Sequence, residues 1–318
     1  MRALAIIIPL VSLMVWTASH AASPLPQAAR TGAYEVVHGW PVFTDGFALG
    51  QVPGVDVDSH NHVFVFHRGD RPVLMIEGDT GKILSSWGDG MFATAHGLKV
   101  DSQDNVWLTD RAHHQVFKFS HDGKLLMTLG AQGVPGLGGL HFNGPTDLAV
   151  APTGEFYVAD GYGNNRVAKF SADGEFLFDW GTKGTAPGEF DLPHGIAMDS
   201  QGRLYVADRS NGRVQVFDPN GKFLDQWKSP ELGRPWGMRV DADDFLYLID
   251  GGDLNPKPPD RGRVLKMTLE GEILEEWGSF GSYDGQFYWA HGVGIGKDGA
   301  VYVTDVHLGM RVQKFVRK

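Results

Sequence analysis

Most of the chain consists of short segments in which apolar and polar residues alternate, separated by turns that are rich in Asp, Gly and Asn. Alternation with a period of two predicts β-strands, and Asp-Gly or Asn-Gly between two such segments predicts an antiparallel hairpin. The strands recur in groups that begin 42 to 55 residues apart. The groups begin at Pro53, His96, Thr146, His194, Trp236 and His291.

Each group continues in the same order after its first strand. A turn leads to a second strand, as at 105–110 and 155–160, then to a third, as at 166–170, and to a fourth that ends in Trp-Gly or Leu-Gly. Four strands repeated at this period are typical of a β-propeller blade. The sequence therefore predicts an all-β fold, a six-bladed β-propeller of four-stranded antiparallel blades.

The two ends of the chain are expected to meet in one blade. The last group, residues 291–318, holds only about three strands, whereas residues 34–40 read as a separate strand near the N-terminus. We expect this N-terminal strand to complete the last blade, because closing the ring in this way removes exposed strand edges.

A histidine stands at the start of every second group. The innermost strand of each blade lines the channel of a propeller, so alternate blades would bring His96, His194 and His291 together as a three-fold ring. Three neutral imidazoles with an open fourth position suit a catalytic zinc or a similar divalent ion. The alternative is that His-Gly merely suits the start of the strand and that the three rings bind water.

Composition narrows the candidate chemistry. The chain has no cysteine, which leaves His, Asp, Glu and backbone oxygen as metal ligands. Its formal net charge of -10 and pI of about 5.7 argue against a nucleic-acid partner, which would require a basic surface.

Residues 1–21 have the pattern of a secretory signal peptide. Met1-Arg2 is basic, residues 3–17 are apolar, and residues 19–21 offer a small-x-small cleavage site. We therefore expect a secreted or periplasmic protein in which residues 22–318 form a single propeller domain, with no membrane span after cleavage. An uncleaved anchor is the alternative. We expect the protein to be a monomer.

The turns after the second strands carry a further set of polar residues. Five of the six contain Asp, which is expected to bind turn amides and to be architectural. Arg68 and Arg209 follow in two of these turns and could form bidentate bonds to an anionic small-molecule or peptide-derived substrate. The alternative for both is a surface or inter-blade salt bridge.

Several motifs match one family in the right order. They are FHRGD at 66, AHGLKVD at 95, TDRAHHQVFKF at 109, PTDLAV at 145, YVADGYGNNR at 157, LPHGIA at 192 and VADRSNGRVQVF at 206. The chain closely resembles the catalytic core of peptidyl-α-hydroxyglycine α-amidating lyase from about Val55 to its C-terminus. More broadly, its groups look like NHL repeats, which occur in enzymes and in interaction modules.

The resemblance implies zinc held by His96, His194 and His291, an active-site tyrosine at Tyr162, and arginines at Arg68 and Arg209. The reaction it implies is cleavage of the C–N bond of a carbinolamide, which gives an amide and glyoxylate. Two alternatives stay open. One is a non-enzymatic NHL-repeat binding module. The other is a propeller hydrolase or lactonase, which typically uses calcium held by Glu, Asn and Asp.

Two positions depart from the family pattern. The family has methionine two residues before the third histidine and aspartate just after it, where this chain has Trp289 and Gly292. The resemblance implies a calcium site formed by that aspartate and by backbone carbonyls at positions matching Val55 and Leu98. Loss of the only carboxylate should weaken calcium binding severely. Trp289 is expected to change the shape of the substrate pocket.

Overall fold

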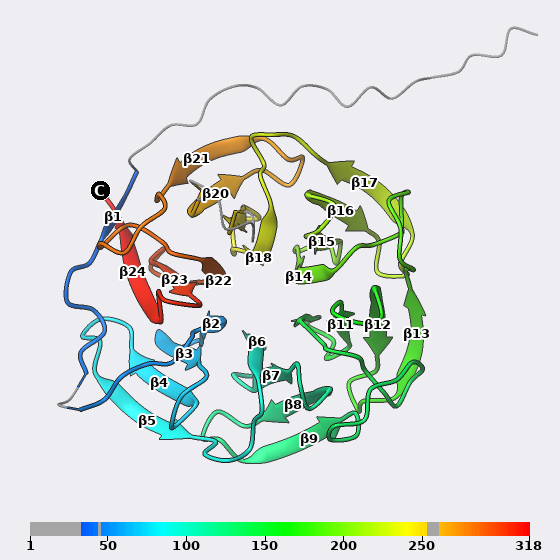
Figure 1. Ribbon diagram of the computed structural model, residues 1–318, viewed down its shortest axis with the longest axis horizontal. Coiled ribbons are helices and arrows are strands. Elements are labelled where there is room, and N and C mark those ends of the chain that lie inside the picture. Colours follow the sequence, from blue (N-terminus) through cyan, green and yellow to red (C-terminus); the bar gives the residue numbers. More distant parts are fainter. Residues whose placement is uncertain (1–32, 44–45, 253–260) are drawn as a thin grey trace, which may run out of the picture.

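A computed structural model describes residues 33–43, 46–252 and 261–318, and it contains six four-stranded antiparallel sheets. Figure 1 shows the sheets arranged radially around a central channel, which confirms the predicted six-bladed β-propeller. The predicted signal peptide, residues 1–21, lies outside the described residues. Within the described ranges no helix is long and apolar enough to cross a membrane.

The strands are consecutive in the chain in every blade except the last. The first blade contains β2 (Gly54–Val57), β3 (His62–Phe66), β4 (Val73–Glu77) and β5 (Ile83–Trp87), and the second contains β6 (Ala95–Val100), β7 (Val106–Asp110), β8 (Gln115–Phe119) and β9 (Leu125–Leu129). The third contains β10 (Asp147–Val150), β11 (Phe156–Asp160), β12 (Arg166–Phe170) and β13 (Phe176–Trp180), and the fourth contains β14 (Pro193–Met198), β15 (Leu204–Asp208), β16 (Arg213–Phe217) and β17 (Phe223–Trp227). The fifth contains β18 (Pro235–Val240), β19 (Leu246–Asp250), β20 (Arg263–Met267) and β21 (Ile273–Trp277), and the sixth contains β22 (Ala290–Ile295), β23 (Val301–Asp305), β24 (Arg311–Arg317) and β1 (Tyr34–Val36).

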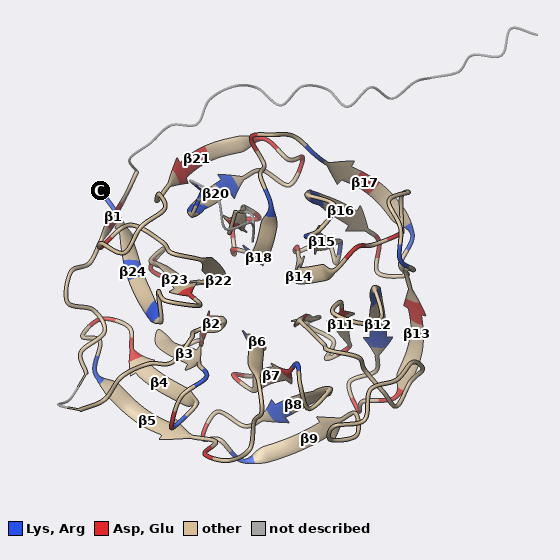
Figure 2. Ribbon diagram, viewed as in Figure 1, with Lys and Arg blue, Asp and Glu red and all other residues tan. Residues whose placement is uncertain are grey.

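The hydrophobic core lies between neighbouring blades. Phe64 and Phe66 of the first blade pack with Leu98, Val106 and Leu108 of the second, and none of these five is more than 2% exposed. Each blade is covered on both faces in this way, which explains why β7 is buried along its whole length. The packing fixes the inner strands from which the channel side chains project. Basic and acidic residues are interspersed around the ring (Figure 2).

Aspartates at the ends of the second strands anchor the loops that enter the inner strands. Asp110 accepts hydrogen bonds from the backbone N–H groups of Ala93 and Thr94, at 2.6 and 3.0 Å. Asp305 accepts the equivalent bonds from Tyr288 and Trp289. The architectural role expected for aspartate in these turns is confirmed at both positions, and it holds the start of each inner strand at one mouth of the channel.

The N-terminal strand closes the ring as predicted. β1 pairs with β24, with Tyr34 opposite Arg317, and the two lie side by side in Figure 1. The ring of Tyr34 stacks on Trp277 at a centroid distance of 4.3 Å, and its hydroxyl lies 3.1 Å from the hydroxyl of Tyr247 in the fifth blade. Trp40 is also buried and donates its indole N–H to a backbone carbonyl of the first blade.

We expect a chain that begins at Val42 to unfold at a temperature at least about 10 °C below that of a chain that begins at Ala33. The shorter chain loses the buried rings of Tyr34 and Trp40 and exposes the edge of β24. Losing a buried aromatic side chain costs about 3–5 kcal/mol, and each kcal/mol lowers the Tm of a protein of this size by about 2 °C or more. Thermal unfolding followed by circular dichroism measures the difference. Equal melting temperatures would show that β1 does not stabilise the ring.

Candidate active site in the central channel

Three histidines from alternate blades converge in the channel. His96 lies on β6, His194 on β14 and His291 on β22, and the ring centroids are 4.8, 4.9 and 4.9 Å apart. All three residues are buried, and a nitrogen of each lies within 4.8 Å of the others. The convergence expected from the spacing of the groups is therefore present, and we call these residues the triad. Their chemical role stays a prediction.

Backbone carbonyls of the intervening blades orient the three rings. Each Nδ1 lies against one carbonyl oxygen: His96 with Thr146 at 2.7 Å, His194 with Trp236 at 2.9 Å, and His291 with Pro53 at 2.8 Å. Because a carbonyl oxygen can only accept, Nδ1 of each ring must donate, which leaves the lone pair of the neutral ring on Nε2.

The glycine after each histidine allows this arrangement. The register between the first and second strands shifts at the His-Gly pair in β6, β14 and β22, so each histidine lies in a β-bulge. A Cβ on Gly97 would lie 2.6 Å from the carbonyl oxygen of Thr146, and one on Gly195 would lie 2.6 Å from that of Trp236. These are the carbonyls that bind the imidazoles. A larger residue would push the next blade away and break the bonds that orient the rings.

The environment keeps all three imidazoles neutral. Burial and, after it, the positive charge of Arg68 together lower the pKa of His291 to about 3. Burial likewise holds the pKa of His96 and of His194 well below the usual range, and Arg209 adds to the effect at His194. A neutral ring with Nδ1 bound to a carbonyl and Nε2 deprotonated is the form in which histidine binds a metal. The donor set therefore fits zinc with further coordination positions open.

Tyr162 lies against the Nε2 edge of the triad. Its hydroxyl lies 3.1 Å from Nε2 of His96 and 3.4 Å from Nε2 of His194. The guanidinium of Arg111 packs over its ring at 4.7 Å, which holds the phenol in place. Tyr162 is among the site residues predicted from the sequence, whereas Arg111 is not, although Arg111 occupies the same turn position as Arg209.

Arg209 and Arg68 flank the triad at the same mouth of the channel. Arg209 is 5% exposed, and its guanidinium stacks on the ring of Trp236 at 3.6 Å. Arg68 is more exposed and donates from Nε to the carbonyl of Ala95, the residue before His96. The sequence did not indicate the role of Trp236. Its position was nevertheless informative, because Trp236 begins the fifth group at the place where a triad histidine begins the second, fourth and sixth groups. Its ring also packs against two of the triad rings, at 5.4 and 5.5 Å.

The position implied for calcium does not fit that ion. A cavity of about 20 Å³ below the triad is lined by Val55, Leu98 and Gly292, but also by Lys99. The ammonium of Lys99 lies 3.3 Å from the carboxylate of Asp147, so a cation already neutralises the carboxylate that lines this cavity. Calcium needs six to eight oxygen ligands, often with carboxylates among them, and an adjacent ammonium would repel it.

Trp289 lies at the triad mouth, where it packs on His307 with a centroid distance of 3.8 Å. His307 holds the same turn position in the sixth blade that Tyr162 holds in the third, which the sequence alone did not single out. Burial lowers the pKa of His307, and Arg68 lowers it further, so these side chains share one electrostatic environment.

The sequence is similar both to a repeat family and to individual proteins along most of the chain. The NHL repeat model matches residues 92–119, 142–170 and 190–217. Peptidyl-alpha-hydroxyglycine alpha-amidating lyase 2 of Drosophila melanogaster is 33% identical over 92% of this chain and 78% of that protein, and lyase 1 of the same organism is 34% identical over 92% and 61%. Peptidyl-glycine alpha-amidating monooxygenase B of Xenopus laevis is 37% identical over 81% of this chain, which spans only 33% of that longer protein.

Solved structures share the fold at lower sequence identity. A streptogramin B lyase has a TM-score of 0.61 and 16% identity, covering 90% of this chain and 97% of its own. A catalytically inactive virginiamycin B lyase from Staphylococcus aureus, solved with quinupristin, has a TM-score of 0.58 and 16% identity, covering 89% of this chain and 88% of its own. These similarities establish the propeller architecture alone.

Proposed function

The protein belongs to the family of peptidyl-α-hydroxyglycine α-amidating lyases, and on this premise we propose that it is a zinc-dependent carbon–nitrogen lyase. The substrate class is an N-acyl α-hydroxyglycine or a related carbinolamide, and the products are an amide and glyoxylate or a related aldehyde. The observation that carries the proposal is the buried, neutral triad with the hydroxyl of Tyr162 against two of its Nε2 atoms.

The triad would hold the zinc through the three Nε2 atoms. When bound, zinc supplies a Lewis acid that polarises the substrate oxygens and stabilises developing negative charge. The carbonyls of Thr146, Trp236 and Pro53 keep each ring in the required tautomer, which prepares the site before any ligand arrives.

Arg209 and Arg68 would bind the substrate carboxylate. Arg209 is held flat on Trp236, so the edge of its guanidinium, where the N–H groups lie, is the part that can reach a planar anion. Because Trp236 also packs against His194 and His291, it fixes the position of Arg209 relative to the triad. Arg68 approaches from the first blade and adds a second positive charge.

Tyr162 would move the proton. The deprotonated oxygen of Tyr162 would accept the hydroxyl proton of the carbinolamide as the C–N bond breaks. The amide nitrogen would take the electron pair of that bond and then the proton from Tyr162, which restores the base. The hydroxyl-bearing carbon becomes the aldehyde carbon of glyoxylate. The balance requires no water and no oxidant, since one carbinolamide gives one amide and one aldehyde.

Glyoxylate release from α-hydroxyhippurate tests this function. We expect equal amounts of benzamide and glyoxylate from the purified protein, loss of the activity on treatment with a chelator, and its recovery on addition of zinc. Failure of the folded, zinc-loaded protein to release an aldehyde from this compound or from other carbinolamides would contradict the proposal and favour the NHL-repeat binding module.

The setting of this reaction is part of the proposal. We propose that residues 1–21 direct export, that residues 22–318 act as a single monomeric domain outside the cytoplasm, and that the substrate is a small or peptide-derived anion. The net charge of -10 supports the expectation that nucleic acid is not a partner.

A further inference from the structure

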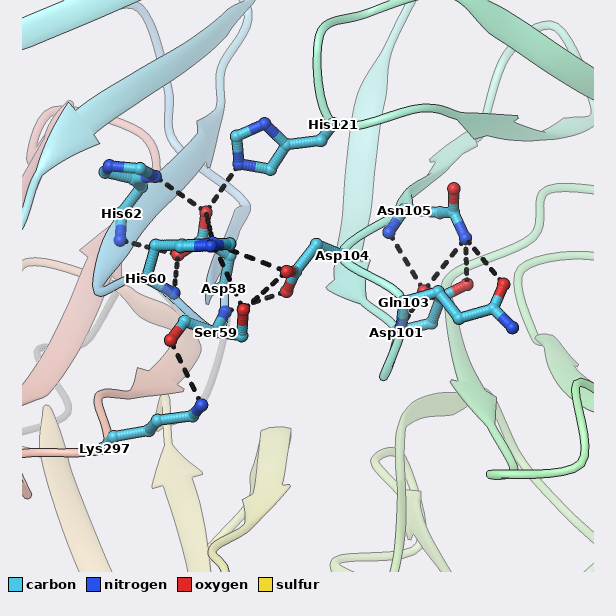
Figure 3. Close-up of polar contacts among 10 residues, drawn as sticks. All are labelled: Asp58, Ser59, His60, His62, Asp101, Gln103, Asp104, Asn105, His121 and Lys297. Atoms are coloured by element: carbon cyan, nitrogen blue, oxygen red, sulfur yellow. Dashed lines mark hydrogen bonds and ion pairs between the residues drawn. The ribbon is translucent and has the colours of Figure 1, made fainter.

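A second group of metal-binding side chains lies away from the triad. Asp58 follows β2, His60 lies in the next turn, His62 begins β3, and His121 lies in the turn between β8 and β9 of the neighbouring blade. One candidate ligand atom of each residue lies within 4.8 Å of the others. Figure 3 shows His62 and His121 directed at the carboxylate of Asp58 from two sides. We call these residues the Asp58 cluster.

The cluster lies at the end of the channel opposite to the triad. The triad histidines begin inner strands, whereas Asp58 follows the end of one, and five residues of a strand span about 16 Å. Asp58 also lines a cavity of about 640 Å³ at this mouth. The cluster is therefore separate from the proposed catalytic centre.

One oxygen of Asp58 has an architectural role that other blades share. Oδ1 accepts hydrogen bonds from the backbone N–H groups of His60 and His62, each at 2.8 Å. The aspartates at the same position in the second, fourth and fifth blades, Asp101, Asp199 and Asp241, bind their own turns in the same way. These bonds fix the direction of the carboxylate and leave Oδ2 to face other side chains.

The partners of Oδ2 distinguish the first blade. In the fourth blade Oδ2 of Asp199 binds the guanidinium of Arg203, and in the second blade Oδ2 of Asp101 binds the side-chain amide of Asn105. Neither partner offers an imidazole nitrogen. In the first blade the same place holds two imidazoles, with Nδ1 of His62 at 2.9 Å and Nε2 of His121 at 2.6 Å. The fold does not require imidazoles here, so their presence calls for another reason.

The distances suit a tetrahedral ion. Zinc binds nitrogen and oxygen at about 2.0–2.1 Å, which places neighbouring ligand atoms about 3.4 Å apart. The nitrogens of His121, His62 and His60 lie 2.6, 2.9 and 4.0 Å from Oδ2 of Asp58, which brackets that value. Small rotations of the side chains would bring all four atoms to a common centre.

Exposure and charge favour capture of a cation. The side chains of His60 and His121 are 65% and 34% exposed, whereas the carboxylate of Asp58 is fully buried. The carboxylate of Asp58 accepts hydrogen bonds from the backbone N–H groups of His60 and His62, and it faces one ring nitrogen each of His62 and His121. The site thus has a fixed anionic ligand and imidazoles open to solvent. The ring of His121 also packs edge-on against Phe64 at 5.3 Å, which limits its rotation.

We propose that Asp58, His60, His62 and His121 form a second metal site, which binds zinc or a similar first-row divalent ion. Three imidazoles and one carboxylate complete a four-coordinate sphere, as in structural rather than catalytic zinc sites. The ion would join the first blade to the second at the mouth opposite the triad, and it would stabilise the folded ring by mass action.

The test uses zinc as the probe and substitutions that other blades already carry. Asn105 of the second blade stands at the position of His62, and Ala172 of the third blade stands at the position of His121. The double variant His62→Asn/His121→Ala should therefore fold. After dialysis against zinc we expect two ions per wild-type chain and one per chain of the double variant, with glyoxylate release unchanged. His38→Ala, which removes an exposed histidine paired with Asp284, should still bind two.

A second measurement separates the two sites. In a His194→Ala chain, whose triad is broken, zinc should still raise the Tm by about 5 °C at a hundredfold excess over the dissociation constant. Adding His60→Ala, which removes a largely exposed side chain, should weaken this zinc binding at least about tenfold without changing the Tm in chelator. Equal zinc binding with and without these substitutions, or no zinc binding by the His194→Ala chain, would overturn the proposal and leave an Asp–His hydrogen-bond network.

Discussion

Replacing His194 by alanine is expected to lower the rate of glyoxylate release at least about 1,000-fold, because it removes one of the three nitrogens that would hold the catalytic metal. A bound divalent ion contributes several kcal/mol of charge stabilisation to a transition state, and about 4 kcal/mol corresponds to this factor. The measurement is kcat/KM with α-hydroxyhippurate, with zinc content determined by mass spectrometry on the same samples. Zinc held by the triad should be lost together with the activity.

The interpretation requires that the variant stays folded. His194→Ala leaves the carbonyl of Trp236 without its hydrogen-bond donor, which should cost about 1–3 kcal/mol of stability. Circular dichroism should therefore show a native spectrum at 25 °C and a lower Tm. His96→Ala should behave in the same way, whereas His38→Ala should be as active as the wild type, because His38 lies on the surface. Activity retained in His194→Ala would contradict the metal mechanism.

The fold and the triad could be read from the sequence because both depend on repetition. The recurrence of one strand pattern defined six blades, and the position of a histidine within that pattern defined its place on the channel wall. The closing strand could be predicted for a related reason, since the last group lacked a strand and residues 34–40 had no other partner.

Contacts between blades could not be predicted in the same way. The stacking of Arg209 on Trp236 and the pairing of Lys99 with Asp147 join residues that are 27 and 48 positions apart. Such contacts depend on the rotamers and the stagger of two packed sheets, which alternation along a single strand does not encode. The charge of Lys99 on a buried inner strand nevertheless indicated such a contact, because a buried ammonium needs a carboxylate nearby.

The alternation of histidine with other residues also has a physical explanation. Each triad ring requires the carbonyl at the start of the next blade as the acceptor for Nδ1. The histidines of the second, fourth and sixth blades are therefore oriented by carbonyls of the third, fifth and first blades. Three rings already lie 4.8 to 4.9 Å apart. A histidine in every blade would crowd six rings into the same layer. Blades that supply an imidazole would then no longer alternate with blades that supply only the carbonyl that orients it.

Replacing Tyr162 by phenylalanine is expected to lower kcat by about 10²–10⁴-fold, the usual contribution of a positioned acid–base group, while zinc binding and Tm stay unchanged. The substitution removes only the hydroxyl, which lies against Nε2 of His96 and His194, and it keeps the ring on which Arg111 packs. The measurements are kcat and KM with α-hydroxyhippurate, zinc content and thermal unfolding. Tyr283→Phe, at a residue that is 79% exposed, is the matched control and should have no effect.

The split between kcat and KM decides what Tyr162 does. A tyrosine that transfers the proton acts only as the C–N bond breaks, so its loss should appear in kcat with KM nearly constant. A tyrosine that merely fills the mouth of the channel would change KM or zinc affinity instead. An unchanged kcat in Tyr162→Phe would contradict proton transfer by this residue and would direct attention to His307, which holds the same turn position in the opposite blade and packs on Trp289.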